Sequence, residues 1–104
     1  LFVMPSLWEG MPYALVEAMA VGVPVIGSDI PGIADIVRPH ETGRLAPAGD
    51  AAALARTICT ALSEDGKSAT MAEAGREAVM KAHSRERMLG SLASCYERLM
   101  EDRA

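Results

Sequence analysis

Two glutamates, Glu9 and Glu17, flank the predicted start of a helix. They are eight positions apart, and a glycine, a proline and several apolar residues lie between them. The first amides of a helix have no partners within the helix and form its positive dipole end, so they attract anions. Carboxylates placed there are either favourable surface charges or contacts for a ligand that offers hydroxyl groups.

The backbone between the two glutamates has the features of a phosphate-binding segment. Pro12 suits the first helical position, where its missing amide would have no partner anyway. The N–H groups of Tyr13, Ala14 and Leu15 then point toward the preceding loop, and Gly10 lets the backbone come close to a ligand. A diphosphate here, with a hydroxyl-bearing group at each end, is the chemistry of a nucleotide-sugar. Spacing alone only suggests this, and two solvated surface charges remain the alternative at this point.

The elements that must position these residues form a strand–helix–strand unit. Residues 1–5 are short, apolar and closed by a proline, residues 13–22 show helical spacing and end in a glycine, and residues 23–29 form a second apolar run. This βαβ unit predicts a parallel sheet with a right-handed crossover. Parallel sheets bind ligands beyond the carboxyl ends of their strands, where loops 5–12 and 28–32 lie.

The remainder of the chain is predicted to be mainly helical. A short helix over residues 31–37 and a brief strand over residues 44–46 precede three helices, which begin at Asp50, Ser68 and Ser84. We expect the apolar stripe of each helix to pack into the core rather than to bind a cofactor. The residues expected on these stripes are Leu15, Val16 and Met19, then Ala51, Leu54, Ala55, Ile58 and Leu62, then Met71, Gly75, Ala78 and Ala82, and finally Met88, Leu92, Cys95 and Leu99.

Composition excludes several classes of protein. The chain has 104 residues, 50% of them hydrophobic, and a net charge of −4. These values predict one small globular domain and argue against nucleic acid or an anionic membrane surface as the main partner. No apolar run is long enough to span a membrane. The chain begins with Leu1 inside a strand-like run, so we expect it to be part of a longer protein with an upstream portion.

The cysteines and histidines show no metal-binding or disulfide pattern. Cys59 and Cys95 lie far apart in the sequence, without a CxxC motif or a neighbouring histidine, so reduced thiols are expected. His40 and His83 are isolated and are expected at the surface. No metal site is therefore predicted.

The stretch PSLWEGMPYALVEAMAVGVPVIGSD, residues 5–29, closely resembles the signature of the family 4 (group 1) retaining glycosyltransferases of GT-B fold. In that family a strand ending in Pro-Ser is followed by Glu-Gly, a helix start, and a second glutamate eight positions after the first. The resemblance continues through GIADIV, HETGRLAPAGD and CYERLM. It implies an α/β, partial Rossmann-like domain with a short parallel sheet and three C-terminal helices. Residues 1–104 would be the C-terminal portion of the nucleotide-sugar (donor) binding domain, preceded by its upstream segment and an N-terminal acceptor domain.

The resemblance also implies a role for each matching residue. Glu9 matches the first glutamate, which contacts hydroxyls of the donor sugar near the reacting carbon, and it is the expected catalytic residue. Glu17 matches the second glutamate, which hydrogen-bonds the ribose hydroxyls of the nucleotide. The segment expected to lie against the sugar and the diphosphate consists of Gly10, Met11, Tyr13, Ala14 and Leu15.

Three positions depart from the family pattern or have an open role. Pro12 replaces a frequent glycine, so one amide donor is absent there. Asp35 stands where a glutamate is more usual, and we expect it to be structural. Trp8 either shields the sugar pocket or packs beneath the loop, and packing is the expectation.

The reaction implied is transfer of a hexose from a nucleotide-diphosphate sugar to an acceptor with retained anomeric configuration and without a metal cofactor. An Arg and a Lys would come from an earlier part of the donor domain, because no Lys or Arg precedes Arg38. The acceptor, a sugar, a lipid or another molecule, would bind the N-terminal domain. The implied location is cytoplasmic and includes the inner face of a membrane. The alternatives are a non-catalytic nucleotide-sugar-binding module, another GT-B-fold enzyme such as a nucleotide-sugar epimerase or a phosphorylase, and a helical interaction domain.

Overall fold

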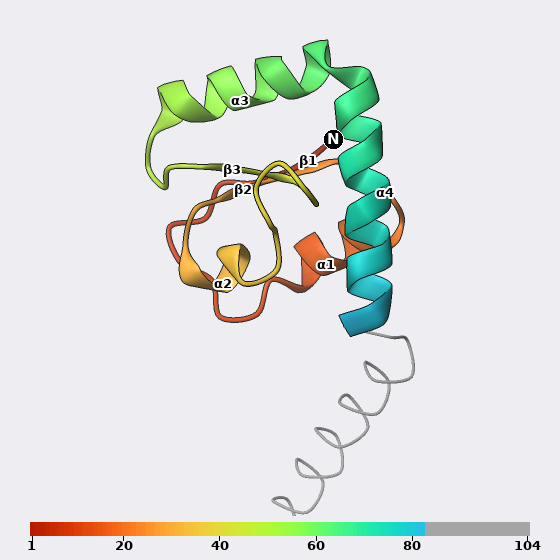
Figure 1. The fold of residues 1–104 in the computed structure, drawn as a ribbon. Helices are drawn as coiled ribbons and strands as arrows, with labels where there is room; N and C mark the ends of the chain where they lie inside the picture. Colours follow the sequence, from red (N-terminus) through yellow and green to blue (C-terminus); the bar gives the residue numbers. More distant parts are fainter. Residues whose placement is uncertain (83–104) are drawn as a thin grey trace, which may run out of the picture.

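The structure, a computed structural model, describes residues 1–82. Its elements are β1 (Phe2–Met4), α1 (Tyr13–Ala20), β2 (Val25–Ser28), α2 (Pro31–Ala34), β3 (Arg44–Ala46), α3 (Ala51–Ser63) and α4 (Asp65–Ala82). The three strands form one parallel sheet in the order β1-β2-β3. Figure 1 shows α3 on one side of the sheet, α1 and α2 on the other, and α4 packed along α1. The predicted α/β class and short parallel sheet are confirmed, whereas the helix predicted from Ser84 lies outside the described residues.

The main core lies between the sheet and helices α1 and α2. Leu15, Val16 and Met19 form the buried face of α1, as the helical spacing predicts. They pack with Ile33 and Val37, whose side chains are completely buried. Burying these side chains stabilises the fold by about 1.5–3 kcal/mol each. In the described part of the chain, no helix is long and apolar enough to cross a membrane.

The end of α1 follows from Gly22, as predicted. Gly22 has a positive φ of 80° and donates its N–H to the Met19 carbonyl at 3.0 Å. The Val23 N–H reaches back to the Ala18 carbonyl at 3.1 Å, which completes a Schellman motif. The chain therefore leaves α1 sharply and enters β2, which keeps the βαβ unit short.

The prediction that Ser68 begins a helix is wrong. Helix α4 begins at Asp65, and only Glu64 separates it from α3. Ser68 lies inside α4, where its buried hydroxyl donates to the Ala61 carbonyl at 2.7 Å and accepts a hydrogen bond from Arg44 at 2.8 Å. A serine resembles an N-cap in sequence, but this one joins two helices and a strand because its partners lie elsewhere in the fold.

The predicted buried stripe of α3 is also wrong. Its buried residues are Ala53 and Ala61, whereas Ala51 and Ala55 are exposed and Leu62 is 60% exposed. The helix is rotated so that small side chains face the sheet, and Leu54 and Ile58 are only half-buried at the margin of the contact.

The stripe of α4 is partly correct. Met71 and Gly75 are buried as predicted, but Val79 is buried in place of Ala82, which is exposed. Gly75 is required by close packing, since a Cβ there would lie 2.8 Å from the Thr42 carbonyl oxygen. Ala78 is half-buried, so the buried face of α4 is shifted by about one residue from the predicted stripe.

Candidate active site

The loop between β1 and α1 holds Glu9 at the carboxyl edge of the sheet. Ser6 donates its hydroxyl to Glu9 Oε1 at 3.2 Å, and Glu9 is half-buried. Gly32 of α2 lies directly against the Glu9 backbone, because a Cβ at residue 32 would overlap the Glu9 carbonyl oxygen. The two loops predicted at this edge are therefore in contact, and Glu9 is positioned by both of them.

The start of α1 differs from the prediction by one residue. Pro12 is the N-cap, with φ −82° and ψ 74°, rather than the first helical residue. The Tyr13 N–H is donated to the Met11 carbonyl at 3.0 Å, and the Val16 N–H to the Pro12 carbonyl at 3.2 Å. Of the amides between them, that of Ala14 belongs to an exposed residue and has no acceptor within residues 1–82, whereas Leu15 is completely buried. Of these two amides, that of Ala14 is the more available to a ligand.

Glu17 lies on the exposed face of α1, opposite the residues that enter the core. Neither Glu17 nor Glu9 forms an ion pair with any residue that the structure describes. Glu17 is the fifth of the eight residues of α1 and lies beyond its first turn, and its carboxylate remains free to accept hydrogen bonds.

The tip of the loop exposes apolar side chains. Trp8 is 82% exposed and Leu7 is 73% exposed, so the prediction that Trp8 packs beneath the loop is wrong. The buried residue of the loop is Pro12, and the Gly32 contact already occupies the inner side at Glu9. A Cβ at Gly10 would meet nothing within 4 Å, so the space in front of that backbone is open in the described part of the protein.

Asp35 and His40 lie outside this loop. Asp35 is the exposed C-cap residue of α2, and its N–H donates to the Pro31 carbonyl at 3.0 Å. The structural role of Asp35 stays a prediction. His40 is exposed, as expected, and occupies a turn with a positive φ of 66°.

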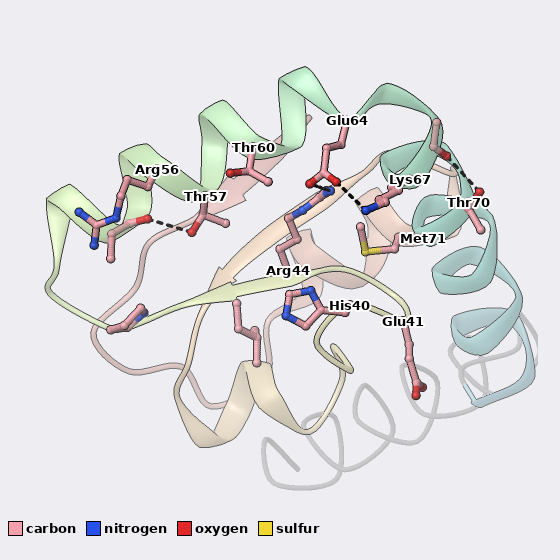
Figure 2. A pocket seen from close by; sticks show the side chains of 14 residues that line it. His40, Glu41, Arg44, Arg56, Thr57, Thr60, Glu64, Lys67, Thr70 and Met71 are labelled. Carbon is pink, nitrogen blue, oxygen red and sulfur yellow. Dashed lines mark hydrogen bonds and ion pairs between the residues drawn. The ribbon is translucent and has the colours of Figure 1, made fainter.

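A larger hollow of about 870 Å³ lies between β3, α3 and the start of α4, and none of the predicted site residues lines it. Figure 2 shows its charged side chains, with Arg44 beneath Glu64 and Lys67. Arg44 is buried, donates to Ser68 and lies 3.8 Å from Glu64, and Glu64 in turn lies 3.0 Å from Lys67. We call Arg44, Glu64, Lys67 and Ser68 the α3–α4 corner.

The charges of the α3–α4 corner mainly satisfy one another. The hydrogen bond from Lys67 lowers the pKa of Glu64 below its usual value, and the charges of Lys67 and Arg44 lower it further. Glu64 therefore stays ionised and holds two cations together. The sequence carries no signal for this cluster, because Arg44 lies far along the chain from Glu64 and Ser68.

Comparison with known proteins places the chain in a family. Residues 1–78 match the family described as "Glycosyl transferases group 1". This chain belongs to the group 1 glycosyltransferases. It is 36% identical over 105 residues to the amylovoran biosynthesis glycosyltransferase AmsK of Erwinia amylovora, covering 95% of this chain and 26% of AmsK. It is 42% identical over 73 residues to the phosphatidyl-myo-inositol mannosyltransferase of Mycobacterium leprae, covering 70% of this chain and 20% of that relative.

Solved structures of glycosyltransferases have the same fold as this group 1 chain. Sucrose-phosphate synthase from Thermosynechococcus elongatus superposes with a TM-score of 0.80 at 36% identity, covering 96% of this chain and 25% of that one. Anabaena Alr3699/HepE in complex with UDP-glucose superposes with a TM-score of 0.67 at 25% identity, covering 81% of this chain and 24% of HepE. The fold is that of the GT-B glycosyltransferases, and the chain spans about a quarter of the length of these relatives.

Proposed function

We propose that the protein containing this chain transfers a hexose from a nucleotide-diphosphate sugar to an acceptor with retention of configuration. The observation that carries the proposal is the placement of Glu9 in the loop before α1, where, within residues 1–82, Ala14 offers an amide without an acceptor and Glu17 a carboxylate without a cation. HepE, which shares the fold, is known in complexes with UDP and with UDP-glucose. Residues 1–104 would supply the C-terminal portion of the donor domain.

Each residue of the site has a proposed role. Glu9 accepts hydrogen bonds from hydroxyls of the donor sugar near the reacting carbon. Its contacts with Ser6 and Gly32 orient the Glu9 residue for this role. Glu17 accepts hydrogen bonds from the ribose, since it has no cation that would compete for it among residues 1–82. The diphosphate lies between them, along the segment formed by Gly10, Met11, Tyr13, Ala14 and Leu15.

Charge stabilisation at the departing diphosphate has to be completed by other parts of the protein. The transition state places growing negative charge on the leaving group, which positioned cations and backbone dipoles stabilise. The first basic residue in this sequence is Arg38, whose side chain is 80% exposed and lies 3.9 Å from Glu41. We propose that an Arg and a Lys upstream in the donor domain act here and that no metal ion is needed. The acceptor, whether a sugar or a lipid at a membrane surface, would bind the N-terminal domain.

The test is a donor-binding and product assay with the full-length enzyme. Calorimetry with UDP, GDP and ADP should show binding of one nucleotide, and transfer from the matching α-linked donor should give an α-linked product in NMR spectra. Binding of no nucleotide would contradict the whole proposal, and a β-linked product would contradict retention alone. Nucleotide-sugar binding without turnover would identify a binding module, and activity that EDTA abolishes would overturn the metal-free mechanism.

A further inference from the structure

A small hollow lies at the carboxyl ends of all three strands, on the side of the sheet that faces α3. It has a volume of about 210 Å³. Its floor follows the strand register: Ser28 pairs with Ala46 in β3, and Pro5 follows Met4, which pairs with Gly27. We call it the carboxyl-edge hollow, and it is lined by Pro5, Ser28, Ala46, Pro47, Gly49, Asp50, Ala51 and Leu54.

Ser28 is the polar group in the floor of the hollow. Successive side chains of a strand alternate between faces, and a Cβ at Gly27 would meet Ile33 of α2, so Ser28 points to the opposite side, toward α3. Ser28 is 5% exposed, and its hydroxyl forms no hydrogen bond within the described residues. Every fully enclosed side-chain N or O atom in that part of the chain has a partner, so the hydroxyl reaches the surface of the hollow. This hydroxyl is therefore available to pair with a ligand or with water in the hollow.

The start of α3 supplies the other polar groups. Asp50 caps the helix, since its Oδ1 accepts from the Ala53 N–H at 2.9 Å and its carbonyl accepts from the Leu54 N–H at 3.0 Å. The Ala51 N–H has no acceptor among residues 1–82, and the second carboxylate oxygen of Asp50 has no donor there. Leu7 of the β1–α1 loop reaches this end of the molecule, because its Cδ2 would lie 3.7 Å from a Cβ at Gly49.

These groups select a particular kind of ligand. The Asp50 carboxylate repels a phosphate, whereas a hydroxyl group can donate to it and can both donate to and accept from Ser28. The remaining walls include the apolar side chains of Pro5, Ala46 and Leu54, which suit the C–H face of a ring. The volume lies below the range of about 300–1,000 Å³ usual for drug-sized ligands, so a whole nucleotide does not fit.

We propose that the carboxyl-edge hollow binds one neutral, hydroxyl-bearing sugar ring, with Ser28 and Asp50 as its polar contacts. The inference rests on the proposed function, because the ring belongs to one of the two substrates of the transfer. It is either the donor sugar or a sugar of the acceptor. The hollow adjoins the loop that carries Glu9, since Pro5 lines it, and we expect Ser28 and Asp50 to contribute to substrate specificity.

The test uses three variants of the full-length enzyme. Ser28→Ala removes the hydroxyl, and Ala51→Leu fills the hollow from an exposed position of α3. Ser63→Ala is the matched control, since Ser63 is exposed and its hydroxyl donates only to the Thr60 carbonyl of its own helix. Affinities for UDP and UDP-glucose, or for the base that the enzyme accepts, are measured by calorimetry, and acceptor KM and kcat are measured by product formation.

The result identifies which substrate carries the ring. If it is the donor sugar, both variants weaken nucleotide-sugar binding about 3- to 10-fold and leave nucleotide binding unchanged. If it is an acceptor sugar, donor binding is unchanged and acceptor KM rises by a similar factor. Ser63→Ala changes neither. Wild-type values for both variants, or an equal loss of all affinities together with a lowered Tm, overturn the proposal.

A structural measurement separates this inference from the proposed function. Crystals of the full-length enzyme soaked in glucose and in mannose should show a ring against Ser28, and crystals of the Ser28→Ala variant should not. An enzyme that binds no nucleotide would overturn the proposed function, and the soak would still decide the hollow. An empty hollow in both soaks, or a ring that persists in the variant, would overturn the inference.

Discussion

The α3–α4 corner and the pair formed by Glu9 of the β1–α1 loop and Glu17 of α1 both carry charged side chains, but only the corner completes its interactions internally. At the corner, Arg44, Glu64 and Lys67 pair with one another, and Ser68 bridges to Ala61. In the loop, Glu9 has one hydrogen bond from Ser6, and on α1, Glu17 has no cation within residues 1–82. A charged cluster whose members satisfy each other stabilises the fold, whereas unpaired groups at a sheet edge are available to a ligand.

The largest expected effect comes from Glu9→Gln in the full-length enzyme. The amide keeps the size of the side chain but loses its charge, so the donor sugar is held less accurately and kcat falls about 100-fold. Steady-state kinetics with the donor measure this effect, and KM for the donor should change little. Ser6→Ala should lower kcat in the same direction by a smaller factor. If the Glu9→Gln enzyme kept the wild-type kcat but bound nucleotide poorly, the roles of the two glutamates would be exchanged.

The second effect concerns nucleotide affinity. Glu17→Ala should weaken nucleotide binding by about 1–3 kcal/mol, because it removes charged hydrogen bonds to the ribose. Calorimetry with the free nucleotide measures it without any contribution from the sugar. Glu77→Ala, an exposed change on α4, is the matched control and should leave the affinity unchanged. Equal nucleotide affinities for the wild type, Glu17→Ala and Glu77→Ala would show that Glu17 is only a surface charge.

A third change tests the contact between the two loops. Gly32→Ala places a Cβ against the Glu9 carbonyl, so we expect a loss of about 1–3 kcal/mol in unfolding free energy together with a lowered kcat. Chemical denaturation and steady-state kinetics measure the two effects. Gly66→Ala is the control, because a Cβ there meets nothing within 4 Å and alanine favours the helix. Unchanged stability in Gly32→Ala would show that the loops are not held together at this point.

The smallest expected effect distinguishes the α3–α4 corner from the site around Glu9 and Glu17. Arg44→Ala should lower unfolding free energy by about 1–2 kcal/mol, since Ser68 keeps its bond to Ala61 and Glu64 keeps Lys67. Nucleotide affinity should not change. Arg76→Ala, which breaks an exposed pair with Glu73, should lower the unfolding free energy by less than Arg44→Ala does. Weaker nucleotide binding in Arg44→Ala would show that the corner contributes to the donor site after all.

The local features of the site could be predicted from the sequence. The order of strand, loop and helix, the buried face formed by Leu15, Val16 and Met19, and the stop at Gly22 all follow from spacing and residue type, and the structure confirms them. The signature residues also predict the GT-B fold, which the solved relatives confirm. The assignment of the chain to the C-terminal portion of a donor domain, and the roles of the site residues, stay predictions.

The predictions that were wrong concern features that depend on contacts between residues distant in the sequence. Spacing along α3 indicates an apolar stripe, but it does not tell which side faces the sheet, and the small residues Ala53 and Ala61 are the ones that pack there. Serine is a residue type common at helix N-caps, yet the hydroxyl of Ser68 forms hydrogen bonds with Arg44 and with the Ala61 carbonyl. Trp8 is apolar enough for burial, but the inner side of its loop is taken by Gly32.

The sequence by itself determined which groups could meet a ligand, because residue type and local spacing place Glu9 and Glu17 on either side of a helix start. Only the tertiary structure decided how those groups are held and which others join them. Gly32 meets Glu9, and Ser28 opens into a hollow beneath α3, because the parallel strands bring the loops at their carboxyl ends to one edge. Propensity and periodicity report on neighbours along the chain, whereas these contacts arise only when the elements pack.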